Sequence, residues 1–330
     1  MTITGTWHKA LEAEILQRSS QIVSVVDGNA YIFGGELRPR EPRDNDVHVF
    51  SFGGDATLST KQASQSPSAR VGAASATLHG KIYIFSGRDG AEAAPLNEAG
   101  SLWEFDPATG SWTVVSPSDS TSRYPASRSY HCMTSDGIDK IYLHAGCLEQ
   151  GRGGDLWAFS LSTKEWTELS TAPGSPRGGT SITFANGKLY RMNGFNGKTE
   201  EGGVLDIYSP EKNTWSSHEF APDGKSGPTP RSVAALLPVS VSGKTYLATL
   251  FGERDPSSLG HQGAGKMLSD VWVFDIESKM WEEVDVKGGV PDARGWFDAD
   301  VLGEDTVVVQ GGLGEDNERL RDVWILKLNP

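Results

Sequence analysis

The sequence predicts an all-β protein, a six-bladed β-propeller in which each blade corresponds to one repeat of the chain. A repeat of about fifty residues occurs six times, a period typical of propeller blades. The 330 residues include 39 glycines and 17 prolines, which suits many short strands joined by turns better than long helices. We therefore expect one domain that spans residues 1–330.

Two strands of every repeat carry a recognisable pattern. The second strand is an apolar segment that ends in a glycine pair or its remnant, at Tyr31–Gly35, Tyr83–Gly87, Tyr142–Gly146, Tyr190–Gly194, Leu247–Gly252 and Val307–Gly312. The third strand joins aromatic and branched residues, at Asp46–Phe50, Leu102–Phe105, Asp155–Phe159, Val204–Tyr208, Asp270–Phe274 and Asp322–Leu326. Large rings at fixed repeat positions fill the space between neighbouring blades, because one blade alone cannot bury both faces of its sheet.

The fourth strand shows how the ring closes. It opens with a tryptophan in four repeats, at Trp112, Trp166, Trp215 and Trp281. The first repeat has Asp55–Ser59 in this place, and the sixth ends at Pro330 without a fourth strand. The segment Gly5–Ala10, which contains Trp7, has the fourth-strand signature. We therefore expect an N-terminal strand, at about residues 5–10, to pair into the last blade and remove the open sheet edges.

On these residues the chain resembles the kelch superfamily over essentially its whole length. The expected fold class is thus all-β, a six-bladed kelch-type β-propeller closed by the N-terminal strand.

Composition and charge exclude several classes of partner. The net charge of −13 argues against a polyanion, so we expect no nucleic acid to bind. No segment resembles a signal peptide, and no run approaches the roughly 18 apolar residues of a membrane helix. We expect a cytoplasmic protein with no membrane partner, and a homodimer is left open. Cys132 and Cys147 are expected as buried free thiols, with a disulfide as the alternative. No glycine-rich phosphate loop opens a helix, so we expect no nucleotide or flavin.

An arginine precedes the first strand of every repeat, at Arg18, Arg70, Arg128, Arg177, Arg231 and Arg294. Because first strands line the channel of a propeller, these arginines would form a ring at one mouth and attract an anionic substrate. The alternative is structural, with each arginine paired to an acid or carbonyl of a neighbouring blade. Arg88 breaks the regularity and is the better single candidate for anion contact. His131 follows Arg128 and either reaches the substrate or is a satisfied structural histidine.

The fifth repeat has the longest loop, from Phe251 to Gly265. Glu253, Asp255 and His261 on this loop supply two carboxylates and one imidazole, a set suited to Fe(II) or another divalent first-row metal. The alternative is ordinary turn chemistry, in which Asp255 only caps a turn.

The segments Glu253–Pro256 and Gly260–Gly265 resemble the iron-binding loop of plant specifier proteins. These kelch proteins convert glucosinolate aglucones into nitriles, epithionitriles or thiocyanates. Further matches are Phe33–Glu36, Gly87–Arg88, Arg128–Met133 and Arg294–Trp296. The resemblance implies that Fe(II) binds at Glu253, Asp255 and His261 and that Arg88 holds the substrate's sulfate. It also implies that Tyr130 and Trp296 line the pocket. The family motif Glu-x3-Asp-x3-His is not kept, because Ser257 stands at the middle position and Asp255 comes early.

Two functions follow as hypotheses from different classes. The first is an Fe(II)-dependent, non-oxidative lyase that acts on an anionic, sulfur-containing small molecule at the propeller mouth. Its catalytic candidates are Arg88, Glu36, Tyr130 and Trp296, with Arg128, Arg177, Arg231, Arg294 and His131 as further substrate contacts. Glu36 follows a glycine pair and is expected to face the same opening. The second is a non-enzymatic platform that binds an acidic peptide through the arginine ring.

Overall fold

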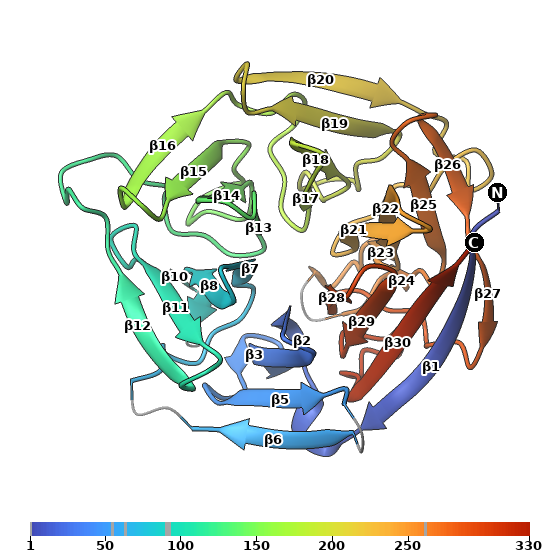
Figure 1. The fold of residues 1–330 in the computed structure, drawn as a ribbon, viewed down its shortest axis with the longest axis horizontal. Helices are drawn as coiled ribbons and strands as arrows, with labels where there is room; N and C mark the ends of the chain where they lie inside the picture. The colour runs from blue at the N-terminus through green and yellow to red at the C-terminus, as the bar shows by residue number, and fades with distance from the viewer. Residues whose placement is uncertain (1, 54–55, 63–64, 90–93, 261–262) are drawn as a thin grey trace.

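The computed structural model describes residues 2–53, 56–62, 65–89, 94–260 and 263–330. Six sheets surround a central axis, and each is built on four strands that follow one another from the axis to the rim, with a fifth short strand added in two of them (Figure 1). The predicted fold class, an all-β six-bladed propeller, is confirmed. Within the described ranges, helical structure is limited to a 3-10 turn, η1 (Glu14–Leu16). None of the described helices is long and apolar enough to cross a membrane.

The strands are grouped by their distance from the axis. The innermost are β2 (Ser19–Val26), β7 (Ala74–Leu78), β13 (Cys132–Ser135), β17 (Ser181–Ala185), β21 (Ala235–Val241) and β28 (Asp298–Leu302). The second are β3 (Asn29–Arg38), β8 (Lys81–Phe85), β14 (Lys140–His144), β18 (Lys188–Met192), β22 (Lys244–Leu250) and β29 (Thr306–Gln310). The third are β5 (Val47–Ser51), β11 (Leu102–Asp106), β15 (Leu156–Ser160), β19 (Val204–Ser209), β25 (Val271–Asp275) and β30 (Asp322–Asn329). The outer are β6 (Thr57–Lys61), β12 (Ser111–Val115), β16 (Glu165–Leu169), β20 (Thr214–Glu219), β26 (Met280–Glu283) and β1 (Thr4–Glu12).

Short strands outside this plan lie in the loops. They are β4 (Glu41–Pro42), β9 (Arg88–Asp89), β10 (Ala94–Pro95), β23 (Glu253–Arg254), β24 (Lys266–Met267) and β27 (Asp285–Gly288). The pair β23–β24 forms the base of the long fifth-blade loop.

The ring closes as predicted, through the N-terminal strand. β1 pairs antiparallel with β30, from Thr4 opposite Asn329 to Glu12 opposite Asp322, so the two ends of the chain share blade 6 (Figure 1). Trp7 on β1 is 2% exposed, and its ring stacks on Phe251 of blade 5 at a centroid distance of 5.6 Å. The sequence did not predict that β27 would add to the outer edge of β1 as a parallel fifth strand.

Aromatic rings join neighbouring blades at the repeat-locked positions. Trp112 of blade 2 packs between Phe33 of blade 1, at 5.0 Å, and Phe105 of its own blade, at 4.9 Å. Trp166 of blade 3 likewise contacts Phe85 of blade 2 at 5.7 Å. The tryptophan that opens the fourth strand therefore seals the boundary between two sheets.

The six ring arginines are buried parts of the architecture, between 0% and 6% exposed. Each guanidinium donates to the carbonyl before the last glycine of the second strand, at 2.8–3.2 Å. Each also lies 2.7–3.7 Å from a carboxylate near the start of the third strand, in the pairs Arg18–Asp44, Arg70–Glu98, Arg128–Asp155, Arg177–Glu201, Arg231–Asp270 and Arg294–Asp322. The partners belong to the same blade, not to a neighbouring blade as the structural alternative supposed.

Two half-buried carboxylates join the innermost strands of the first and last blades. Asp298 Oδ2 accepts a hydrogen bond from the Val23 N–H at 2.6 Å, and Asp300 Oδ2 accepts one from the Val25 N–H at 2.7 Å. These side chains satisfy backbone donors of β2 that face away from β3. They therefore close the inner seam between blades 6 and 1, as β1 closes the outer one.

We expect the seam aspartates to make stability fall as pH rises between about 4 and 7. Burial raises the pKa of Asp298 to about 7 and that of Asp300 to about 6, from 3.8. The folded chain then binds more protons than the unfolded chain in this window, so its free energy of unfolding decreases with rising pH. Urea unfolding of the wild type and of the Asp298→Asn/Asp300→Asn variant across this range measures the effect. If the free energies of unfolding of the two chains differed by the same amount at every pH, the prediction would be wrong.

Candidate functional site

Six residues with left-handed backbones surround the channel mouth, each two positions after a ring arginine. They are Ser20 (φ 59°), Gly72 (62°), Tyr130 (51°), Gly179 (61°), Val233 (47°) and Trp296 (50°), hereafter the collar. Ser20, Gly72, Tyr130, Gly179 and Val233 each donate a backbone hydrogen bond of 2.7–2.9 Å to the collar carbonyl of the preceding blade. This conformation is costly for a branched or aromatic residue. The hydrogen bonds between blades hold it in place, so the collar residues keep fixed positions around the opening.

Two cavities meet at the collar. The mouth pocket, of about 290 Å³, lies over blades 3–6, and the channel cavity, of about 380 Å³, lies between the innermost strands. Both are lined by Tyr130, Gly179, Val233 and Trp296. Tyr130 and Trp296 therefore line the mouth pocket, where the resemblance to specifier proteins places them. Burial and the charge of Glu36 raise the pKa of Tyr130, so its phenol stays protonated.

The mouth pocket owes its lining to one recurring position. In each blade, the residue directly after the last glycine of the second strand pairs through its backbone with the residue directly after the ring arginine. In blade 2, for example, Arg88 forms an antiparallel β-bridge with Val71. These residues are Glu36, Arg88, Cys147, Phe195, Glu253 and Leu313, hereafter the rim residues. Cys147, Phe195 and Glu253 line the mouth pocket, together with Val233, Pro256 and Trp296. The pocket is therefore mostly apolar, with a few polar groups at fixed places, as is common for small-molecule sites.

Glu253 is the buried acid of this pocket, 5% exposed. Its Oε1 accepts a hydrogen bond from the Gly265 N–H at 2.8 Å, across the base of the long loop. A Cβ at position 265 would come within 2.5 Å of this oxygen and 2.6 Å of the Asp255 backbone carbonyl oxygen, so the close approach of the two chain segments requires glycine. Burial, together with the charge of Glu200, raises the pKa of Glu253 to about 7.

Of the other two predicted metal ligands, only Asp255 is described, and it does not join Glu253. The Asp255 side chain is 74% exposed, lies 3.4 Å from Arg254 Nε and does not line the pocket. The early position of Asp255 in the motif turns its carboxylate toward solvent, so the structure does not place it as a ligand. His261 lies outside the described residues. No group of three or more metal-ligating side chains occurs among the residues that are described.

A second carboxylate acts on Glu253 from blade 4. The negative charge of Glu200 contributes to the raised pKa of Glu253, and burial also raises the pKa of Glu200 itself. Glu200 Oε1 is buried and has no hydrogen-bond partner within the described ranges. Sequence reasoning missed Glu200 because it lies on a different repeat from the long loop.

Two arginines beside the mouth pocket have no acidic partner in the described part of the chain, in contrast to the six ring arginines. Arg152 lines the pocket, and its guanidinium carbon lies 5.0 Å from the centre of the Phe195 ring. Arg88 lies next to the pocket and donates from Nη2 to the Leu148 carbonyl at 3.2 Å. The charges of both arginines act on the Cys147 thiol. Sequence reasoning found Arg88 but missed Arg152.

The remaining predicted site residues have structural contacts. Glu36 Oε1 accepts a hydrogen bond from Arg319 at 2.9 Å, Glu36 lines neither cavity, and burial raises its pKa. His131 is 6% exposed at the wall of the channel cavity, and its ring meets Phe85 edge-on at 5.8 Å. Burial and the charge of Arg128 lower the pKa of His131 to about 3, so the imidazole is neutral.

The substrate contacts predicted for Arg128, Arg177, Arg231 and Arg294 gain no support from the geometry. None of these four lines the mouth pocket or the channel cavity, and each is bound to an acid of its own blade. Cys132 and Cys147 are free thiols, as expected, but each is half-buried where the sequence predicted full burial.

Fold, collar and mouth pocket together describe a kelch propeller with a small-molecule-sized cavity at one opening. The chain belongs to the family described as KLHDC2/KLHL20/DRC7 Kelch-repeats domain, which matches residues 20–252. The solved structure of YjhT is similar with a TM-score of 0.72, over 97% of this chain and 99% of that chain, at 15% identity. This likeness shows the shared fold.

Among individual proteins, the chain is similar to the N-(sulfonatooxy)prop-2-enimidothioate sulfolyase of Thlaspi arvense. The two are 27% identical over 359 aligned positions, which cover 99% of this chain and 98% of that protein. Kelch domain-containing protein 10 of Homo sapiens and that of Bos taurus are each 28% identical over 182 residues. These two matches cover 52% of this chain and 38% of each relative. The resemblance to plant specifier-type proteins therefore extends over nearly the whole chain.

Proposed function

We propose that this chain is a specifier-like lyase that binds an anionic, sulfur-containing small molecule in the mouth pocket. The near full-length similarity to a protein named as a sulfolyase supports this class of reaction. The observation that carries the proposal is the pair Arg88 and Arg152. Arg152 lines the apolar mouth pocket, and Arg88 lies beside it, where both charges act on the pocket residue Cys147. Neither has an acidic partner in the described ranges, whereas the six ring arginines are paired.

The two guanidinium groups suit a sulfate ester. Arginine donates several hydrogen bonds in a fixed plane, which matches the oxygens of sulfate or carboxylate. As the N–O bond of a sulfated thioimidate breaks, sulfate leaves with the electron pair, the C–S bonding electrons form the third carbon–nitrogen bond of a nitrile, and the sulfur is released. Arg88 and Arg152 stabilise the charge that develops on the sulfate oxygens. Phe195, Trp296 and Val233 enclose the organic part and exclude water.

Fe(II) is part of the proposal as the cofactor. When bound, it would supply Lewis-acid or one-electron chemistry at the substrate's sulfur. Glu253 fits as a ligand, because its buried carboxylate has no cationic partner in the described part of the chain and its pKa is raised by burial and by Glu200. The unpartnered Oε1 of Glu200 makes that side chain a better second donor than the solvent-facing Asp255.

We expect Glu253→Gln to lose bound iron and at least about 90% of activity, and Asp255→Asn to retain both. The two variants remove the same charge from one loop, and only Glu253 lines the pocket. Iron content after anaerobic purification is measured by mass spectrometry, next to the release of sulfate and the nitrile or thiocyanate products. A chelator should remove both iron and activity. Equal iron in all three chains would exclude Glu253 as a ligand.

The peptide-binding platform is the second candidate, and the match to a kelch-repeat domain family favours it. The arginine ring cannot bind such a peptide, because its guanidinium groups are buried in ion pairs. An acidic peptide would instead meet Arg88 and Arg152. Peptide binding that is lost in Arg152→Met, in a chain that releases no sulfate and holds no iron, would favour the platform over the lyase.

A further inference from the structure

We propose that the channel cavity below the collar is a second binding compartment, which takes a small organic cation bearing amine or hydroxyl groups. The proposal does not depend on the lyase activity proposed for the mouth pocket. It rests on the chemistry of the cavity lining, on its volume and on the groups there that lack partners.

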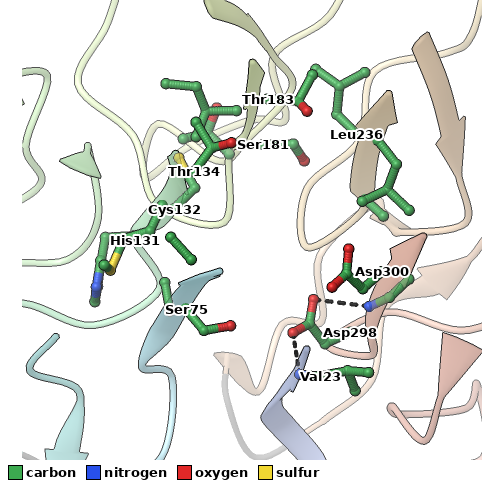
Figure 2. A pocket seen from close by; sticks show the side chains of 18 of the residues that line it. Val23, Ser75, His131, Cys132, Thr134, Ser181, Thr183, Leu236, Asp298 and Asp300 are labelled. Carbon is green, nitrogen blue, oxygen red and sulfur yellow. Dashed lines mark hydrogen bonds between the residues drawn. The ribbon is translucent and has the colours of Figure 1, made fainter. Parts of the chain in front are cut away.

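Hydroxyl groups dominate the polar lining of this cavity. They come from the innermost strands of blades 1 to 4, at Ser24, Ser75, Thr77, Thr134, Ser135, Ser181 and Thr183. Figure 2 shows Ser75, Thr134, Ser181 and Thr183 around the space that Asp298 and Asp300 face from the opposite wall. A hydroxyl can donate or accept a hydrogen bond, so this wall suits a ligand with several polar groups.

The negative charge of the cavity is concentrated on blade 6. Each of the two aspartates accepts two backbone hydrogen bonds, from Val23 and Ala299 for Asp298 and from Val25 and Val301 for Asp300. A carboxylate has about four acceptor sites, so each retains about two for a ligand.

These carboxylates have no compensating cation in the lining. No lysine or arginine is among the described residues that line the cavity, and the one histidine there, His131, is neutral because burial lowers its pKa. Burial raises the pKa of both Asp298 and Asp300, which shows how unfavourable their charges are without a partner. A cation in the cavity would offset this cost.

A further acceptor lies in the same lining. Gln21 is 4% exposed, and its Nε2 donates to the Gln310 carbonyl at 2.8 Å. Its Oε1 has no hydrogen-bond partner in the described part of the chain. A buried acceptor without a donor is costly, so a ligand that donates hydrogen bonds suits the cavity. Gln21 follows the collar residue Ser20, so this acceptor belongs to the end of the channel nearest the mouth.

The volume favours an organic cation over a single metal ion. A cavity of about 380 Å³ exceeds the roughly 30 Å³ that one water occupies in the liquid by an order of magnitude. It shares four collar residues with the mouth pocket, and at its own collar end Gly72 faces Tyr130. A Cβ on Gly72 would meet the Tyr130 ring at 3.1 Å, so glycine leaves room for that ring at the opening.

Calorimetric titration of the full chain at pH 8 tests the proposal with three probes of equal length. These are 1,4-diaminobutane, butane-1,4-diol and succinate, with calcium chloride as an inorganic cation. We expect the diamine to bind at least ten times more tightly than the diol, and succinate not to bind. Asp300→Asn should weaken the diamine at least tenfold. Asp292→Asn is the matched control, because it removes an exposed carboxylate eight positions earlier, and it should bind like the wild type.

The proposal is overturned if succinate binds as tightly as the diamine, if Asp300→Asn has the same affinity as the wild type, or if Asp292→Asn weakens binding equally. Calcium binding that needs Asp300, without diamine binding, would also overturn it in favour of a metal site. If Asp300→Asn does not fold, the ranking of the three probes on the unaltered chain decides. Thr183→Val then tests the hydroxyl wall and should weaken the diol about threefold or more.

Discussion

Replacing Arg128 with alanine is expected to lower the free energy of unfolding by about 3–5 kcal/mol. The Arg128 guanidinium donates to the carbonyls of Ala126 and Ala145 and holds both oxygens of Asp155 at 2.8 Å. Burial alone would raise the pKa of Asp155, but the hydrogen bonds and charge of Arg128 lower it. Removing the arginine takes the cation and two hydrogen bonds from Asp155, which is 25% exposed and keeps the bond from Trp157 Nε1. The carbonyls of Ala126 and Ala145 also lose this donor.

Urea unfolding measures this loss, with Arg123→Ala as the control. The Arg123 side chain is 81% exposed and pairs with Glu168 at the surface, so its removal should change stability by less than about 1 kcal/mol. Arg128→Lys should recover little of the loss, because one ammonium group cannot reproduce the planar donor set of a guanidinium. If Arg128→Ala unfolds at the same urea concentration as the control, the arginine ring is not structural.

At the mouth, Arg88→Met and Arg152→Met should each reduce kcat/KM for a sulfated substrate by about 30- to 150-fold. The range corresponds to about 2–3 kcal/mol for a hydrogen bond to a charged group in an enclosed site. The reduction should appear in kcat as well as in KM, because the charge on the leaving sulfate grows as the N–O bond breaks. Methionine keeps much of the side-chain volume, so the change reports on charge.

Arg38→Met provides the comparison for this prediction. Its side chain is 76% exposed on the corresponding loop of blade 1, and its removal should leave kcat/KM unchanged. The two mouth variants should also unfold like the wild type, since neither arginine has an acidic partner in the described ranges. If Arg152→Met has the same kcat/KM as the wild type, the sulfate does not bind at Arg152 in the mouth pocket, and the lyase proposal is wrong.

The fold could be predicted from the sequence because its signals are local and repeated. The second-strand glycines and the third-strand aromatics recur at one position in every blade, and the fourth-strand tryptophan recurs in every blade except the first. The segment around Trp7 precedes the first repeat, so it can only supply the fourth strand that the last repeat lacks. The fifth strand β27 escaped prediction, because nothing in Asp285–Gly288 distinguishes an added edge strand from a loop.

The site was predicted in part. Tyr130, Trp296 and Glu253 do meet at one pocket, whereas Asp255 points to solvent. The regular spacing of the ring arginines was compatible with two roles, a structural role in ion pairs within the fold and the binding of an anionic substrate. Only the partners, such as Asp155 for Arg128, decide between the two, and those partners lie tens of residues away in the sequence.

One sequence signal for the missed residues was present. The rim position that holds Arg88 and Glu253 also holds Cys147 and Phe195, each directly after the last glycine of a second strand. Comparing this position across repeats predicts Phe195, and with it the ring on which Arg152 stacks. The sequence could not predict the left-handed backbone conformation of the collar residues. Valine and tryptophan disfavour this conformation, yet Val233 and Trp296 adopt it.

A crystal structure with a bound, unreactive sulfated thioimidate analogue tests the central claim most directly. We expect the sulfate oxygens within hydrogen-bonding distance of the guanidinium groups of both Arg88 and Arg152, with the organic part against Trp296. A sulfate group bound away from both arginines, or an analogue found outside the mouth pocket, would contradict the proposed function.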